Sequence, residues 1–237
     1  MSNSYFQKCV YLKKEIINYI TTIFRVYDDE LVLKLEDYNL LKNRHNCLES
    51  STAPGFIIEE FIVSKLEKYS KKENIFCINR AKDNTATNHS YDCYTEFKNL
   101  LCMINIKVQK DKGQNNAISA INILHRDYCS NPSQEKAYLI IKIHYTFNDS
   151  NSKNERVLSI LGNERVLSIL GVDGYFLEEV NFSDGHKQDS RNWSKEFKAQ
   201  SGRLLINDSF RNKNKCDITQ ISYQKTFDFI KQIAHSE

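Results

Sequence analysis

The sequence predicts an α/β fold in which a central mixed β-sheet is flanked by helices. An opening helix-like segment leads to strand-like segments near the middle of the chain, and these are followed by a helix-like segment and a further strand. Strands and helices in this order are typical of a sheet that is covered by helices. With 237 residues, the chain is long enough to bury a substantial core.

The first half of the chain contains three segments with the apolar spacing of helices. Residues 5–25 and residues 29–43 are the first two, separated from the third by a stretch rich in turn-forming residues. The third, residues 56–69, places its apolar residues on one face at a period near 3.6. At roughly 100° per residue, Glu59 lies about 60° from Ile62, at the margin of that face, whereas the side chain of Glu60 points to solvent.

The central segments predict the strands of the sheet. Residues 74–81 and 91–97 form two strands, and residues 100–109 form the strongest one, an apolar run followed by alternation. A helix over 115–128 and a buried strand over 137–147 follow. Side chains alternate along a strand, so the third strand has one face with Leu101, Met103, Asn105 and Lys107, and another with Ile104, Ile106 and Val108.

The last third of the chain opens on a duplication. The nine residues NERVLSILG occur at 154–162 and again at 163–171, and we expect them to lengthen a strand or a hairpin arm. Two copies are too few for a solenoid. Residues 172–186 predict a strand and a turn, residues 191–200 a short helix, and residues 219–234 an amphipathic helix.

Composition predicts one soluble, cytoplasmic domain. The chain is 41% hydrophobic and 27% charged, with a formal net charge of +3 and no run of about 20 apolar residues. Its seven cysteines form no CxxC pair, which favours reduced thiols over zinc ligands. We expect a single domain over 1–237, with its core at 52–147, a helical part at 1–50, and a C-terminal part at 148–237 that extends the sheet and contacts a ligand.

The residues with the clearest chemical potential are Asp92 and, thirteen positions later, Asn105-Ile106-Lys107. An acid on one strand beside a second oxygen ligand and a lysine on the next can gather two oxygens and an ammonium group. Hard cations such as Mg²⁺ prefer oxygen ligands. Phosphodiester hydrolysis needs such a cation, a positioned water and a charge that stabilises the transition state.

This pattern resembles the PD-(D/E)XK nuclease superfamily, and most closely the HincII-like type II restriction endonucleases. The likeness covers roughly residues 52–147, with a weaker patch at 181–198. PGFIIEEFIVSKL resembles the family's helix with Glu59 in the place of its glutamate, and INIKVQ resembles its acid-x-Lys strand. NNAISA resembles the start of the following helix, with Asn116 at the matching position, and VNFSDGHKQDSRNWSKEF resembles a late turn segment.

The resemblance implies a restriction-endonuclease-like core and Mg²⁺-dependent, sequence-specific hydrolysis of double-stranded DNA by a homodimer. It implies catalytic roles for Asp92, Asn105, Lys107 and Glu59. Asp92, Asn105 and the Ile106 carbonyl would hold the metal, and Lys107 would orient the attacking water or stabilise the transition-state charge. The products would have 5′-phosphate and 3′-hydroxyl ends.

Several basic and polar residues are candidates for DNA contacts, because lysine and arginine neutralise phosphates and polar loops near a cleft recognise base edges. They are Lys110, Lys112, Asn115, Asn116, Lys187, Arg191 and Lys213.

The family has an acid where this chain has Asn105, so the expected metal affinity is lower. A shifted register, with Asp83, Glu96 and Lys98 at the same spacing, is an alternative site. Two other functions stay open. The chain could be a repair or mobile-element nuclease of the same fold, or a catalytically degenerate DNA-binding module.

Overall fold

The computed structural model describes residues 4–28, 30–34, 52–73, 76–81, 89–111, 116–147, 164–182 and 203–235. The helices are α1 (Tyr5–Arg25), α2 (Thr52–Glu73), α3 (Ile121–Cys129), α4 (Asp208–Lys213) and α5 (Gln220–His235). The strands are β1 (Glu30–Lys34), β2 (Ile78–Arg80), β3 (Cys93–Phe97), β4 (Leu100–Lys110), β5 (Ala117–Ala120), β6 (Glu135–Phe147), β7 (Glu164–Phe176) and β8 (Arg203–Leu205).

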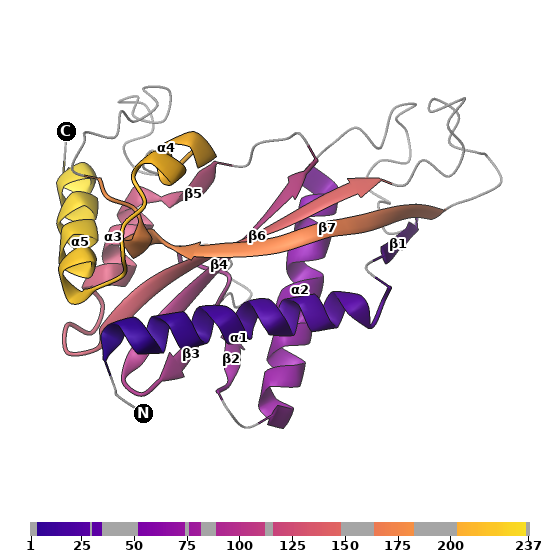
Figure 1. Cartoon of the computed structure of the whole chain (residues 1–237), viewed down its shortest axis with the longest axis horizontal. Helices are drawn as coiled ribbons and strands as arrows, with labels where there is room; N and C mark the ends of the chain where they lie inside the picture. Colours follow the sequence, from indigo (N-terminus) through magenta and orange to yellow (C-terminus); the bar gives the residue numbers. More distant parts are fainter. Residues whose placement is uncertain are drawn as a thin grey trace.

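A six-stranded sheet in the order β1-β7-β6-β4-β3-β2 forms the centre of the fold (Figure 1). The neighbours β4 and β6 run parallel, and all the remaining neighbouring pairs in this sheet are antiparallel. β5 and β8 make a separate two-stranded sheet. The prediction of an α/β fold with a central mixed sheet and flanking helices is therefore confirmed.

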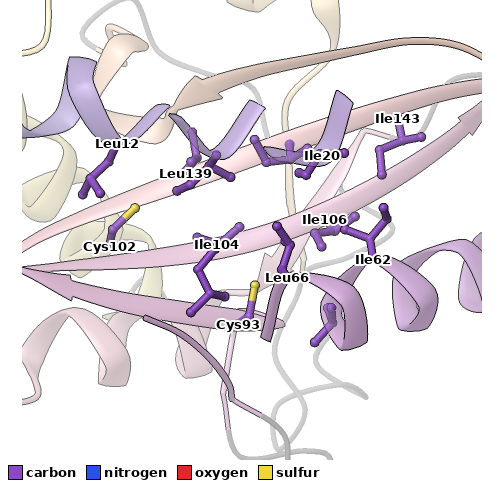
Figure 2. Packing of buried hydrophobic residues seen from close by; sticks show 14 of the residues in the cluster. Leu12, Ile20, Ile62, Leu66, Cys93, Cys102, Ile104, Ile106, Leu139 and Ile143 are labelled. Carbon is purple, nitrogen blue, oxygen red and sulfur yellow. The ribbon is translucent and has the colours of Figure 1, made fainter. Parts of the chain in front are cut away.

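Helices cover both faces of the sheet. The first hydrophobic cluster joins α1 and α2 to one face, and Figure 2 shows Leu12 and Ile20 of α1 on the same side of the sheet as Ile62 and Leu66 of α2. The second cluster joins α3 and α5 to the opposite face. The sheet is thus the middle layer of three.

The strand β4 separates these two clusters by strict alternation. Ile104 and Ile106 belong to the cluster under α1 and α2, whereas Leu101 and Met103 belong to the cluster under α3 and α5. The predicted two faces of this strand are confirmed. Asn105 and Lys107 therefore belong to the face covered by α3 and α5.

The predicted helix over 29–43 is wrong where the structure describes it. Residues 30–34 form β1, which pairs antiparallel with β7. Leu31 and Leu33 repeat every second residue, which is the period of a strand. Residues 35–43 lie outside the described part.

The predicted helix over 115–128 begins later than expected. Residues 117–120 form β5, which pairs with β8 across some 85 residues of sequence, and α3 starts only at Ile121. The pairing partner of β5 is distant in the sequence, so local apolar spacing did not reveal it.

The remaining elements agree with expectation in part. Residues 5–25 are helical throughout, β6 covers the predicted strand at 137–147, and α5 agrees with the predicted C-terminal helix to within one residue at each end. The second copy of NERVLSILG enters β7, whereas the first copy and residues 191–200 lie outside the described part. Within the described ranges, no helix is long and apolar enough to cross a membrane.

Candidate active site on the third and fourth strands

The pairing of β3 with β4 brings Asp92 and Asn105 together. Cys93, which follows Asp92, is the register partner of Ile104, which precedes Asn105, and the Asp92 amide donates to the Ile104 carbonyl at 2.9 Å. The Asp92 carboxylate is buried, and its Oδ2 accepts a 2.8 Å hydrogen bond from the amide of Ile106. The acid is thereby fixed against the backbone of the strand that bears Asn105 and Lys107.

The side chain of Asn105 is buried in a group of oxygen acceptors. Its Nδ2 donates to the Ser90 carbonyl at 2.7 Å and to the Tyr138 hydroxyl at 2.9 Å, and lies 3.3 Å from the Ile118 carbonyl. Its Oδ1 is also buried but has no hydrogen-bond partner among the described residues. An acceptor left without a donor in a buried site costs about 1–3 kcal/mol, which points to a ligand role for this oxygen.

A buried aspartate on α3 holds the segment that precedes Asp92. Asp127 accepts a 2.6 Å hydrogen bond from the Ser90 amide through Oδ2, and its Oδ1 lies 3.4 Å from Nδ1 of His89. The Tyr138 hydroxyl donates to the same Ser90 carbonyl that Asn105 contacts. Burial raises the pKa of Tyr138, so its phenol stays protonated and remains a donor.

Lys107 lies two residues beyond Asn105 on the same face and is half-buried. Its register partner on the parallel strand β6 is Lys142, which is buried and forms an ion pair with Asp208 of α4 at 2.5 Å. Two lysines therefore lie side by side on neighbouring strands, next to the Asp92–Asn105 pair.

The oxygens at this position suit Mg²⁺ in kind, because hard cations select carboxylate, amide and carbonyl oxygens. Asp92 supplies a carboxylate, and the buried Oδ1 of Asn105 lacks a donor. The Ile106 carbonyl lies on the same edge of β4 as the Ile106 amide that Asp92 contacts, since both groups of a strand residue point to one side. These three oxygens bring only one negative charge, that of Asp92. The described ranges contain no group of three acidic, histidine or cysteine side chains that could hold a metal.

Glu59 comes from α2, on the other face of β4. A Cβ added to Gly55 would lie 3.9 Å from the Cβ of Val108, which places the start of α2 over the end of β4 near Lys107. Glu59 follows Gly55 by one helical turn. It is half-buried, which agrees with the predicted position at the margin of the apolar face. The predicted exposure of Glu60 is confirmed, and its carboxylate pairs with Arg80.

The candidate DNA contacts are only partly described. Lys110 is exposed at the end of β4, and Lys213 is exposed at the end of α4. Asn116 is half-buried, and its carbonyl accepts from the Ile206 amide at 2.9 Å. Four further candidates lie outside the described residues, namely Lys112, Asn115, Lys187 and Arg191.

The shifted register has less structural support. Glu96 is exposed on β3, and Lys98 lies in the β3–β4 turn with a left-handed φ of 49°. Asp83 lies outside the described residues. Lys98 therefore follows the end of β3 instead of sharing a strand face with Glu96.

No local pattern in the sequence singles out Ser90, Tyr138 or Asp127 for the site, because they come from three segments that only the fold brings together. Lys142 did have a local signal. It is the single lysine within the apolar run YLIIKI of β6, and a buried charge in such a run requires a partner.

Comparison with known proteins gives no relative from which a function could be transferred. No protein-family model matches the chain, and a search of curated proteins returns no match.

Proposed function

We propose that this protein is a Mg²⁺-dependent endonuclease of the PD-(D/E)XK type, acting as a type II restriction enzyme on double-stranded DNA. The observation that supports this most directly is the hydrogen bond from the Ile106 amide to the Asp92 carboxylate. It fixes the acid beside the strand whose next two polar side chains, Asn105 and Lys107, share one face. That arrangement is the one on which the resemblance to the superfamily rests.

In this proposal, Asp92, the Asn105 Oδ1 and the Ile106 carbonyl hold the metal. Bound Mg²⁺ would polarise the scissile phosphate and favour deprotonation of water. Lys107 orients the attacking water and offsets the negative charge that develops on the phosphate. Three further residues position the site without contacting the metal. Ser90 and Tyr138 accept hydrogen bonds from Asn105 and fix its rotamer, and Asp127 holds the segment that bears Asp92.

We further propose that the enzyme acts as a homodimer on a short palindromic site, since a two-fold protein suits a two-fold DNA sequence. Glu59 is the candidate for a second carboxylate, but α2 packs on the face of β4 opposite to Asn105 and Lys107, so this carboxylate would have to reach the metal around the end of the strand. Light scattering of the purified protein with and without duplex DNA measures the oligomeric state.

A DNA-binding module without catalytic activity is the second candidate, and the geometry of Asn105 favours it. The Asn105 amide already donates to the Ser90 carbonyl and the Tyr138 hydroxyl, whereas an acid at this position would supply a second negative charge for the metal. Because Asp92 is the single carboxylate among the proposed metal ligands, the affinity for Mg²⁺ is lower. At a sufficiently low affinity, the protein would bind DNA without cutting it.

A plasmid-cleavage assay distinguishes the two candidates. Supercoiled DNA is incubated with Mg²⁺ and either the natural protein or the Asn105→Asp variant. We expect slow, Mg²⁺-dependent cutting by the natural protein and cutting about tenfold faster by the variant, because a second carboxylate strengthens the metal site; tenfold in rate corresponds to about 1.4 kcal/mol. Asn99→Asp, at the exposed β3–β4 turn, is the matched control and should cut like the natural protein.

Replacing Lys107 tests the other half of the site. Lys107→Ala should abolish cutting in both backgrounds, whereas Lys71→Ala, on the exposed surface of α2, should leave it unchanged. Binding of duplex DNA without any cutting, even by Asn105→Asp, would support the binding module. Unchanged cutting by Lys107→Ala would exclude the site as assigned, and failure to bind or cut DNA would exclude both functions.

A further inference from the structure

Two rows of aligned residues run across the sheet from the proposed catalytic residues. In the first row, Asn105 of β4 is aligned with Ile140 of β6, and Ile140 with Tyr175 of β7. In the second row, two residues further along β4, Lys107 is aligned with Lys142, and Lys142 with Asp173. Residues aligned in this way lie on one face of the sheet, about 4.8 Å apart from strand to strand.

Two cations in this region share one carboxylate. The Nζ of Lys142 lies 2.5 Å from Oδ1 of Asp208, and Nη2 of Arg211 lies 3.5 Å from the same oxygen. Burial would raise the pKa of Asp208, but the hydrogen bond and the charge of Lys142 outweigh it and hold that pKa below its usual value. Asp208 therefore remains an anion between the two cations.

A buried donor without a partner adjoins this cluster. The guanidinium of Arg211 lies over the ring of Tyr175, 4.6 Å from its centroid. The Tyr175 hydroxyl is buried and has no hydrogen-bond partner in the described part of the chain. Burial raises the pKa of this phenol, so it keeps its proton and can donate to an anion.

The exposure of the three charged side chains shows which of them an incoming anion would meet first. The side chain of Lys142 is 1% exposed and that of Arg211 is 20% exposed, whereas that of Asp208 is 42% exposed. The carboxylate thus lies on the solvent side of the cations. It occupies the position that an external anion would need.

We propose that Lys142, Arg211 and the Tyr175 hydroxyl form a second phosphate subsite, in which Asp208 is an internal counter-ion that a DNA phosphate displaces. The subsite lies one strand away from Lys107, and it would take the phosphate next to the scissile one. This inference rests on the proposed function, because it takes duplex DNA as the ligand.

If Asp208 is a counter-ion that DNA displaces, its removal should strengthen DNA binding. Removing the carboxylate frees two cations for DNA, so Asp208→Asn should bind DNA more tightly, although it deletes an ion pair. Asparagine keeps the shape of the side chain and an oxygen that Lys142 can contact, which limits the loss of stability. Arg211→Gln removes a cation from the subsite and should weaken binding.

Fluorescence anisotropy with a short labelled DNA duplex tests this prediction over a series of NaCl concentrations, with Ca²⁺ in place of Mg²⁺ to suppress cutting. We expect Asp208→Asn to bind about three- to tenfold more tightly at low salt and to steepen the log–log salt slope by up to about 0.9, the value for one phosphate contact. Arg211→Gln should weaken binding by a similar factor and flatten the slope by a similar amount.

Asp228→Asn is the matched control, because it makes the same change in net charge at an exposed position on α5. Thermal unfolding of each variant verifies that it is folded. If the natural protein cuts plasmid while Asp208→Asn matches Asp228→Asn in affinity and slope, or binds more weakly than the natural protein, the subsite is excluded and the proposed function stands. If the natural protein neither binds nor cuts DNA, both are excluded.

Discussion

At the scale of single residues, Asn105 determines what the site can do. Its amide nitrogen donates to the Ser90 carbonyl and the Tyr138 hydroxyl. An ionised carboxylate in place of this amide would put a second acceptor oxygen against these two oxygens. An acid there needs a proton or a cation to offset that repulsion. An amide at this position therefore stabilises the site without a metal, and under the proposed function it would be a weaker metal ligand than an acid.

Asp127 gives a prediction that does not depend on the proposed function. Asp127→Ala removes the acceptor of the Ser90 amide, a hydrogen bond of 2.6 Å in which both residues are buried. We expect a loss of about 1–3 kcal/mol in the free energy of unfolding, the cost of an unsatisfied buried donor. Urea unfolding measures it. Asp127→Asn, which retains one acceptor oxygen, should recover part of the loss, and equal stability of all three proteins would contradict the role given to Asp127.

The sequence predicted Asp92, Asn105 and Lys107 as site residues from spacing and from alternation along one strand, and in the structure the Asp92 carboxylate accepts from the Ile106 amide of that strand. It did not identify Ser90, whose carbonyl lies in an irregular segment before β3. Backbone groups have no residue-specific signal. A site partly built from carbonyls is therefore only partly visible before the fold is known.

At the scale of elements, regular periodicity was the reliable guide. The apolar spacing of residues 5–25 predicted α1 to its ends, and alternation predicted both faces of β4. The errors fell on short strands with distant partners. β1 pairs with β7, and β5 pairs with β8, so their strand conformation depends on neighbours more than 80 residues away.

The close packing of β7 against β6 and α1 gives a prediction at this scale. A Cβ added to Gly174 would lie 2.9 Å from Cδ1 of Ile141 and 3.3 Å from Cδ1 of Ile17 on α1. Gly174→Ala should therefore reduce the free energy of unfolding by about 1–3 kcal/mol, the usual cost of overpacking a core.

Gly171 on the same strand is the matched control, because an added Cβ there meets nothing within 4 Å. Gly171→Ala should change stability by less than about 1 kcal/mol, because the added Cβ has room and the lower conformational entropy of the unfolded chain favours folding. Urea midpoints of the two variants make the comparison. A loss of similar size in both would show that crowding of the Gly174 position by β6 and α1 is not the cause.

At the scale of the whole molecule, one buried carboxyl connects the layers. Glu178 follows β7 and accepts hydrogen bonds from the Tyr128 hydroxyl of α3 at 2.6 Å and from the Tyr138 amide of β6 at 3.1 Å. Burial is the largest effect on its pKa and raises it from 4.5 to about 7, although both hydrogen bonds lower it. Tyr5 and Tyr223, from α1 and α5, interact with the same carboxyl.

Those neighbours stay neutral over the range in which Glu178 titrates. Burial raises the pKa of Tyr5 and Tyr128 well above the usual phenol value, and it raises the pKa of Tyr223 to about 12. Nearby Cys9 also has a raised pKa because of burial. The change in charge between pH 4.5 and 7 at this junction of layers therefore belongs to Glu178.

The sign of the resulting pH dependence follows from the protons held in each state. Below pH 4.5 the carboxyl is protonated in both the folded and the unfolded chain, and its contribution to stability is fully present. Between pH 4.5 and about 7 the unfolded chain releases the proton while the folded chain retains it, so stability falls as pH rises. At about 1.4 kcal/mol per pH unit, the loss is on the order of 3 kcal/mol and levels off above pH 7.

The Glu178→Gln variant tests this, because glutamine cannot ionise but still offers an oxygen to Tyr128 and Tyr138. Urea unfolding at pH 5, 6, 7 and 8 should show that the natural protein loses stability across the first three values, whereas Glu178→Gln loses much less and exceeds it at pH 8. Glu96→Gln, at an exposed position on β3, should keep the slope of the natural protein. The same slope in Glu178→Gln and the natural protein would mean that a different group titrates, and the buried carboxyl would then be a purely neutral link between the layers.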